Sequence, residues 1–294
     1  MSAPTSSVWL DGDVLPMTEA VAPMLSHGLH YGTGVFEGIR VYDTERGPAV
    51  FRLDAHMERL ARGAQLLGMP VDVAAMAASV HPLLRRNRLT SAYVRPLAFY
   101  SGGGLGLDLG PLTATQTVAV LPWTSHLGDA AAEQGVSLRI SPVRRVSSQA
   151  LPPLKLTGMY ANACVAKLEA VSQGYQEALF VDDRGYVVEA TGENVFLVQD
   201  GRVVAVEHPD ALPGITRDTV ACLADAERRP VTLDELLQAD EVFLTGTSAE
   251  VAPVTRLEGR GTLPIGPVTR ALRTLYQEVV HGRVPQADAW LTWG

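Results

Sequence analysis

The sequence predicts an α+β protein with two domains. Its 294 residues are about twice the usual length of one domain, and 47% of them are hydrophobic, so the chain can bury a large core. Helical periodicity and short strand-like runs occur in both halves, and a loop-like stretch, PWTSHLG, lies between the halves. We therefore place a smaller N-terminal α+β domain at 1–121, an interdomain loop at 122–134 and a larger C-terminal domain at 135–294.

The first half is predicted to contain five strand-like segments and two helices. The strand-like segments are expected at 6–17, 32–43, 48–54, 92–100 and 116–123. The runs VFEGIRVYD and PAVFRLD, joined by ERG, indicate a hairpin. One helix is expected over 55–68, with Asp54 as its N-cap and Gly68 at its end, because Met57, Leu60, Ala64 and Leu67 share one helical face. A second helix is expected over 73–88.

The second half is predicted to combine helices with an antiparallel-rich sheet. Strands are expected at 136–140, 177–183, 185–191, 194–199 and 202–207, and helices at 160–172, 215–226, 233–239 and 268–281. The close succession of four strands is typical of an antiparallel meander. The segment ACLADAERRPVTLDELL shows no clear strand between its helical parts.

Composition excludes several classes of protein. A net charge of −8 without a basic block argues against a nucleic-acid partner, because binding to phosphate backbones requires clustered positive charge. The apolar runs are shorter than the ~18 residues of a bilayer span, and the start has no basic leader and no apolar core of a signal peptide, which predicts a cytoplasmic protein without membrane contact. Cys164 and Cys222 match no metal or redox spacing and are predicted to be reduced core thiols.

The chain contains 24 basic residues, and the sequence shows lysine at only two positions, Lys155 and Lys167. Lys155 lies in LPPLKLTGMY, after two prolines and directly before a predicted helix, where its ammonium group should be partly desolvated. Burial lowers the pKa of a lysine and leaves it nucleophilic at neutral pH, which is what a Schiff base with a substrate or with pyridoxal phosphate requires. Lys167, near Glu169 on a predicted helix, is explained by a solvated helix face.

A lysine that serves pyridoxal phosphate predicts partners for the phosphate and for the ring. The amides of Ile215 and Thr216 would open a helix after Pro213-Gly214, and helix N-termini favour phosphate. The hydroxyl-rich turn LTGTSAE and Arg59 could add further donors. Glu189, after an apolar strand, could keep the pyridine nitrogen protonated. An ordinary helix cap, a solvated arginine and an exposed carboxylate remain the alternatives for these features.

Taken together, these segments resemble the class IV pyridoxal-phosphate aminotransferases, and among them the branched-chain amino acid aminotransferases. The resemblance covers nearly the whole chain, from about Val8 to Val280, and its motifs occur in the family's order. They are SHGLHYGTGVFEGIR, FRLDAHMERL, TSAYVRPL, the run from KLTGMYANACVAKLEA to GENVFLV, LPGITRD and EVFLTGTSAEVAPV. The resemblance implies the two-domain fold type IV architecture.

The resemblance also implies roles for individual residues around the cofactor, pyridoxal 5′-phosphate. Lys155 would form the Schiff base and then move the proton between the substrate Cα and the cofactor. Tyr160 would bind the phenolic oxygen of the cofactor, Glu189 the pyridine nitrogen, and Asn194 would lie behind the ring. The implied phosphate ligands are Arg59, Ile215, Thr216 and Thr247.

The substrate side of the site is implied in the same way. The implied substrate-binding residues are Tyr31, Phe36, Arg40, Tyr93, Arg95, Leu107, His126 and Ser248. An apolar box would be formed by Phe36, Tyr31, Tyr93 and Leu107. Arg95 would help to bind the distal carboxylate of glutamate, and the Thr247-Ser248 turn would receive the α-carboxylate. Tyr31 and Leu107 would come from a neighbouring subunit, which implies a homodimer or a higher homo-oligomer. His126 stands where similar enzymes have a tyrosine near the glutamate carboxylate.

The expected reaction is a ping-pong transamination between leucine, isoleucine or valine and 2-oxoglutarate, giving a branched 2-oxo acid and L-glutamate. Within the same fold the alternatives are a D-amino acid or (R)-amine aminotransferase, an aminodeoxychorismate lyase, and a biosynthetic enzyme for an unusual β-branched amino acid. A nucleotide-binding module is disfavoured, because SGGGLGLDLG lacks the GxGxxG and P-loop patterns. No metal site is predicted, since HGLH has no third ligand.

Overall fold

The computed structural model describes residues 7–122 and 134–294. The chain forms two compact units. The first contains 7–122 together with Leu154–Met159 and Val279–Gly294, and the second contains 134–153 and Tyr160–Glu278. The boundary predicted at 122–134 lies almost entirely outside the described residues and stays a prediction. A division at one point of the sequence does not separate the two units, because Leu154–Met159 and the C-terminal segment belong to the first unit.

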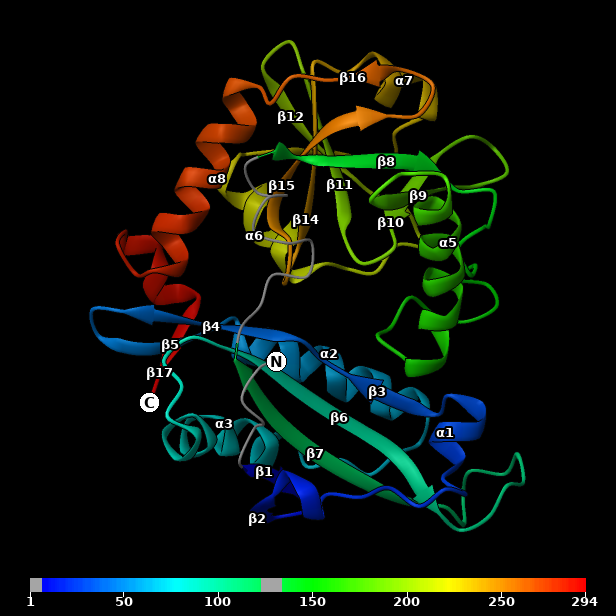
Figure 1. Ribbon diagram of the computed structural model, residues 1–294, viewed down its shortest axis with the longest axis vertical. Helices are drawn as coiled ribbons and strands as arrows, with labels where there is room; N and C mark the ends of the chain where they lie inside the picture. Colours follow the sequence, from blue (N-terminus) through cyan, green and yellow to red (C-terminus); the bar gives the residue numbers. More distant parts are fainter. Residues whose placement is uncertain (1–6, 123–133) are drawn as a thin grey trace. The chain divides into compact units, whose positions relative to one another are not determined.

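The first unit is built on a sheet in which eight strands are described, all paired antiparallel with their neighbours (Figure 1). In sheet order they are β17 (Leu291–Trp293), β5 (Gly47–Phe51), β4 (Ile39–Thr44), β6 (Ala92–Gly102), β7 (Thr113–Pro122), β1 (Ser7–Leu10) and β2 (Asp13–Pro16), with β3 (Gly34–Phe36) also on β6. The predicted hairpin is confirmed, since β4 and β5 pair from Val41↔Val50 to Thr44↔Gly47.

The helices of the first unit are α1 (His27–Tyr31), α2 (Leu53–Leu66) and α3 (Val73–Asn87), with short 3-10 turns η1 (Met17–Glu19), η2 (Thr157–Met159) and η3 (Pro285–Ala289). The prediction of Asp54 as the N-cap of α2 is wrong. Arg52 occupies the cap position with φ 51°, and its amide donates to the carbonyl of Trp290, so the helix begins before Asp54. Asp54 lies in the first helical turn, where its charge favours the positive end of the helix dipole. Gly68, with φ +61°, follows the helix as predicted.

The second unit is built on a mixed sheet in which nine strands are described. In sheet order they are β10 (Val187–Ala190), β9 (Glu177–Val181), β8 (Val136–Ile140), β15 (Glu250–Leu257), β14 (Glu241–Gly246), β11 (Asn194–Gln199), β12 (Arg202–Val206) and β13 (Glu227–Arg229), with β16 (Gly261–Thr262) on β15. The strand β8 is parallel to both β9 and β15, and β12 is parallel to β13.

Two predictions for this sheet need correction. The continuous meander is wrong, because β10 pairs with β9 while β11 pairs with β14 and β12, so β10 and β11 are not neighbours. Both strands are buried along their length, so their own residues give no preference for one partner over another. The segment expected to lack a strand contains β13, which pairs with β12 through Val204↔Glu227, Ala205↔Arg228 and Val206↔Arg229.

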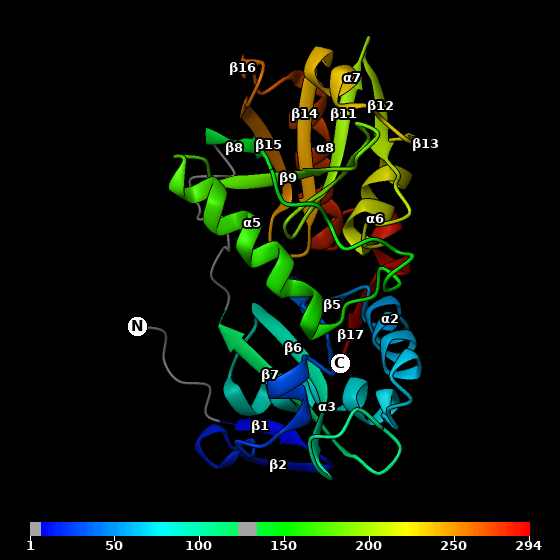
Figure 2. The ribbon, with the colours of Figure 1, turned by 90° about the vertical axis from the view of Figure 1, so that its right-hand side faces the viewer.

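The helices of the second unit are α5 (Tyr160–Ser172), α6 (Ile215–Leu223), α7 (Leu233–Gln238) and most of α8 (Pro267–Val280). Figure 2 shows α5 lying across β8 and β9. The alanines at 163, 166 and 170 are buried on α5, and small side chains there let the helix approach the sheet closely. Among the helices of the described ranges, none is long and apolar enough to cross a bilayer.

Two predictions about side chains of the helices are wrong. Lys167 is not a freely solvated cation, because its Nζ lies 2.6 Å from Oε2 of the buried Glu177 on β9. Helical spacing alone did not reveal this partner, which lies ten residues further along the chain. Cys164 and Cys222 are exposed rather than part of the core, since each lies on the outer face of its helix.

Candidate active site

The backbone on both sides of Lys155 is fixed to the first unit. The Phe36 amide donates to the Lys155 carbonyl over 3.2 Å, and Leu156 forms an antiparallel bridge with Val35. After the lysine, Thr157 Oγ1 and the Gly158 amide both donate to the Gly32 carbonyl, over 2.7 and 3.1 Å. Thr157 and Gly158 therefore hold the backbone after Lys155 against the turn that follows α1.

This attachment requires glycine at position 32, and it leaves little room at Gly158, where an added Cβ would lie 3.2 Å from the Gly32 carbonyl oxygen. Gly32 has φ +68°, a left-handed conformation that side chains disfavour, and a Cβ added to it would lie 2.5 Å from the Gly158 Cα. The close contact between Gly32 and Gly158 places the turn after α1 against the segment that follows Lys155. The glycines of GTG and KLTG in the sequence thus act as a pair, which the sequence alone did not show.

Three of the predicted substrate-side residues gather beside Lys155. Its Nζ lies 5.0 Å from the centre of the Phe36 ring, and the Arg95 guanidinium lies 4.9 Å from the same ring. Arg95 Nη2 also donates to the Tyr93 hydroxyl over 3.1 Å. The hydroxyl occupies the space that a Cβ on Gly38 would need. The first unit therefore brings together the Lys155 amine, the Phe36 ring and the Arg95 guanidinium, which can bind a carboxylate.

Arg40 lies directly opposite Tyr93 in the β4–β6 pairing. It is 6% exposed, and its guanidinium carbon lies 4.6 Å from the centre of the Tyr42 ring. The structure thus places Arg40 on the strand next to the Tyr93–Arg95 pair.

Tyr31 and Leu107 lie on the surface of the first unit and are 50% and 79% exposed. His27 connects their two segments: its ring lies 4.6 Å from the Tyr31 ring, and its Nε2 donates to the Gly106 carbonyl over 3.0 Å. Both histidines of HGLH have protein partners, because His30 Nε2 donates to the Met24 carbonyl.

Arg59 is buried and forms an ion pair that sequence reasoning missed. Its Nε and Nη2 donate to Oε1 and Oε2 of Glu37 over 2.6 and 2.9 Å, and His56 Nδ1 lies 2.7 Å from Glu37 Oε2. Burial opposes the charge of Glu37, but Arg59 and His56 outweigh burial and hold the pKa of this carboxyl well below its usual range. Burial lowers the pKa of His56. Two sequence signals could have indicated this ion pair. Glu37 is a charged residue in an otherwise uncharged run, and His56 lies three residues before Arg59, on the same helical face.

Glu189 lies at the end of β10 and is 5% exposed. Its Oε1 accepts from Arg145 Nε over 2.7 Å, and its Oε2 accepts from the Leu212 amide over 2.9 Å and from Asn194 Nδ2 over 3.4 Å. Asn194 Nδ2 also donates to the Leu212 carbonyl over 3.0 Å. The predicted residues Glu189 and Asn194 are thus brought together with the turn that precedes α6.

That turn leads into the predicted anion site. Gly214 is the N-cap of α6, and a Cβ on it would overlap Asn194 Oδ1, so only glycine allows this approach. Within the described residues, no side chain caps α6, which leaves the first amides, including those of Ile215 and Thr216, oriented for an anion. Both residues are buried, at 8% and 3% exposure.

The other predicted residues of the second unit lie on its turns and at a helix start. Thr247 and Ser248 are half-buried in the turn between β14 and β15, which the Gly246↔Glu250 pair closes. Tyr160 is the first residue of α5 and is half-buried. His126 lies outside the described residues.

Glu193, another buried carboxyl, packs against Gly246 at the start of the turn between β14 and β15 and was missed by sequence reasoning. A Cβ on Gly246 would lie 3.2 Å from Glu193 Cγ. Burial, reinforced by the charge of Glu177, raises the pKa of Glu193 to about 8. The surroundings of this side chain therefore favour its protonated form.

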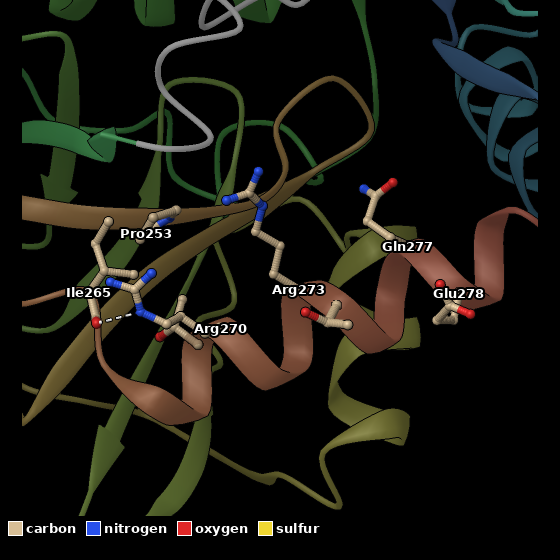
Figure 3. A pocket seen from close by; sticks show the side chains of 8 residues that line it. Pro253, Ile265, Arg270, Arg273, Gln277 and Glu278 are labelled. Atoms are coloured by element: carbon tan, nitrogen blue, oxygen red, sulfur yellow. Dashed lines mark hydrogen bonds between the residues drawn. The ribbon is translucent and has the colours of Figure 1, made fainter.

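A separate open pocket of about 500 Å³ lies along α8 (Figure 3). Arg270, Arg273 and Gln277 line it, and Arg270 Nε donates to the Ile265 carbonyl over 3.1 Å. The residues of the predicted site do not line this pocket.

Comparison with known proteins agrees with this arrangement. The family described as "Amino-transferase class IV" matches residues 34–257. The chain therefore belongs to the class IV aminotransferases. Within that class it is similar to the branched-chain-amino-acid aminotransferase of Pseudomonas aeruginosa, with 38% identity over 296 residues, covering 97% of this chain and 96% of the relative.

Two solved structures have the same fold. The branched-chain amino acid aminotransferase of T.th., solved with pyridoxamine 5′-phosphate, is 41% identical, with a TM-score of 0.93 and 98% of both chains covered. Other structures of that enzyme are complexes with N-(5′-phosphopyridoxyl)-L-glutamate and with 4-methylvaleric acid. The Escherichia coli branched-chain amino acid aminotransferase is 35% identical, with a TM-score of 0.93, covering 98% of this chain and 99% of that one. The predicted fold class, α+β of fold type IV, is confirmed.

Proposed function

We propose that the protein is a pyridoxal-phosphate-dependent aminotransferase that moves the amino group between a branched-chain L-amino acid and 2-oxoglutarate. The observation that carries the proposal is the position of Lys155 Nζ beside the Phe36 ring, which also contacts Arg95. An apolar wall suits the side chain of leucine, isoleucine or valine, and the arginine suits the distal carboxylate of glutamate. The names of relatives at 38% and 41% identity support the same activity.

The donors in the second unit fit the cofactor. Pyridoxal phosphate needs donors for a dianionic phosphate and an acidic partner for its ring nitrogen. The start of α6 has no side-chain cap among the described residues, and Glu189 is held in place by Arg145, Asn194 and Leu212. When bound, the cofactor supplies an aldehyde for amines and a protonated ring that accepts electrons.

Each protein group then has one role in binding the cofactor. Lys155 holds it through its amine, Glu189 binds the ring nitrogen, and the Tyr160 hydroxyl binds the phenolic oxygen. Asn194 donates to Glu189 and would help to keep this carboxylate in place. The proposed phosphate ligands are Arg59, Ile215, Thr216 and Thr247. Glu37 occupies two nitrogens of Arg59 and fixes the direction of its guanidinium.

The Lys155 amine also moves the proton that transamination requires. With the cofactor bound, the free Nζ of Lys155 would be the base that takes the proton from the substrate Cα. The same amine returns a proton when the second 2-oxo acid is converted. One group can act in both directions because transamination runs as two half-reactions on the same atoms.

The substrate is oriented by polar groups at its two ends. The amides and hydroxyls of Thr247-Ser248 receive the α-carboxylate, and Arg95, with Tyr93, receives the distal carboxylate of glutamate. Phe36 and Tyr93 contact the branched side chain, and Arg40 adds positive charge on the neighbouring strand. The role of His126 stays a prediction.

The test is a panel of amino donors added to the holoenzyme while the visible absorption of the cofactor is recorded. L-Valine, L-leucine, L-isoleucine and L-glutamate should each bleach the band, and the corresponding 2-oxo acids should restore it. D-Alanine and (R)-1-phenylethylamine should leave the band unchanged. Reaction with D-alanine or the arylamine, without reaction of the branched-chain amino acids, would overturn the substrate assignment.

The working form is proposed to be a homodimer or a higher homo-oligomer. The surface around α1 and the loop that carries Leu107 is apolar: Met24 is 78% exposed, Leu29 67% and Leu107 79%. Exposed apolar clusters of this kind mark protein contacts. Sedimentation equilibrium should give at least twice the chain mass of 31.4 kDa. A monomer at micromolar concentration would contradict the proposal.

The predicted cytoplasmic location stays a prediction.

A further inference from the structure

The carboxylate proposed to bind the ring nitrogen has a buried cationic partner. Arg145 Nε lies 2.7 Å from Glu189 Oε1, and both side chains are 7% exposed. A carboxylate removed from water keeps its charge only where a cation or hydrogen-bond donors compensate the loss of hydration. Arginine is protonated at any physiological pH, so Arg145 supplies a permanent positive charge at this carboxylate.

Arg145 is held in a fixed orientation by two elements. Its Nη1 donates to Asn162 Oδ1 on α5 over 3.4 Å, and its guanidinium lies 5.9 Å from the centre of the Phe180 ring on β9. The preceding residue, Arg144, faces elsewhere: its Nε donates to Asp183 over 2.8 Å, and its side chain is 51% exposed. Two consecutive arginines thus have different partners, and Arg145 is the one that binds Glu189.

We propose that Arg145 is a positioning residue that keeps Glu189 ionised, so that the proton between this carboxylate and the cofactor's ring nitrogen lies on the nitrogen. The inference rests on the proposed function. The two groups share one proton, which either charges the ring or neutralises the carboxyl. Arg145 forms a direct hydrogen bond to Glu189. Its positive charge therefore lowers the basicity of the carboxylate more than the basicity of the ring nitrogen, which would be further away. Without Arg145 the proton moves to Glu189, and the neutral ring accepts electrons less readily.

Three variants separate this role from a purely structural one. Arg145→Met removes the charge and keeps an apolar stem, Arg145→Lys keeps a charge, and Arg144→Met is the matched control. The readout is the ¹⁵N resonance of the ring nitrogen in holoenzyme loaded with ¹⁵N-labelled pyridoxal phosphate. Wild type, Arg145→Lys and Arg144→Met should show a protonated nitrogen, and Arg145→Met an unprotonated one. A loss of packing alone would lower the melting temperature and leave the resonance in place.

A second readout uses binding to the apoprotein. An analogue of pyridoxal phosphate with a C–H in place of the ring nitrogen should bind wild type about 10-fold or more weakly than the natural cofactor, because a charge-assisted bond is lost. Arg145→Met should discriminate far less between the two. Equal discrimination by Arg145→Met, or a protonated ring in that variant, would overturn the inference and leave the proposed function intact. An unprotonated ring in wild type would contradict the role proposed for Glu189.

If Arg145→Met does not fold, a measurement on the wild-type chain can test the inference instead. The ¹³C resonance of the Glu189 carboxyl, assigned by comparison with Glu189→Gln, should be that of an ionised group over about pH 5 to 8 in the apoprotein. A protonated Glu189 carboxyl within that range would overturn the inference.

Discussion

Replacing Lys155 with alanine should reduce the rate of transamination by about 10⁴-fold or more, because the variant lacks both the covalent link to the cofactor and the base for the Cα proton. The measurement is the single-turnover rate with L-leucine, after loading the variant with pyridoxal phosphate. Added methylamine should restore part of the rate, since a free amine can replace the missing base. The fixed backbone around Lys155, through Phe36, Thr157 and Gly158, should let the variant keep its fold.

Lys167→Arg is the matched control for this prediction. Arginine keeps a positive charge for the buried Glu177, whereas alanine would leave that carboxylate without its cation and cost stability. The control should have a rate within a few-fold of wild type. A Lys155→Ala enzyme that retained more than about a hundredth of the wild-type rate would contradict the role of Lys155, since a missing general base alone costs about that factor.

Replacing Glu189 with glutamine should lower kcat by about 10²- to 10³-fold. A neutral amide cannot hold a proton on the ring nitrogen, so the ring loses the charge that stabilises electrons released from the substrate. KM for L-leucine should change much less, because Glu189 lies at the cofactor end of the proposed site. Stopped-flow measurement of the half-reaction separates these two effects.

Glu193→Gln is the matched control, because it makes the same change in a buried carboxyl four residues further on. Burial, reinforced by the charge of Glu177, raises the pKa of Glu193 to about 8 and favours its protonated form, so glutamine should be tolerated there. Equal losses of kcat in the two variants would show that the effect comes from disturbance of the loop 191–193 and would remove the argument for Glu189.

The sequence was sufficient to predict most helices and strands and the residues with distinctive chemistry. Lys155 was identified because lysine is rare in this chain and stands in an apolar loop before a helix. Glu189 lies near the end of an apolar strand, and Gly214 precedes a helix, so both have local signals. The periodicity of α3 and α5 was strong enough to place both helices within one residue.

The missed features depend on contacts between segments that are distant in sequence. The pairing of β11 with β14 rather than β10 joins residues about 50 positions apart, and no local pattern specifies it. Arg145 is one of two consecutive arginines in the irregular segment 141–154, and its partner Glu189 lies 44 positions further on. The start of α2 depends on a hydrogen bond from Arg52 to Trp290, which only the folded chain brings together. Contacts between distant segments therefore account for most of the differences between the predicted and the observed structure.

The most direct test of the central claim is to reduce the holoenzyme with borohydride and to map the modified lysine by peptide mass spectrometry. The chain offers two lysines for comparison, Lys155 and Lys167. The cofactor should be attached to the peptide that contains Lys155, with Lys167 unmodified. Attachment to Lys167, or a complete absence of covalent cofactor from yellow protein, would contradict the assignment of Lys155 and the aminotransferase mechanism built on it.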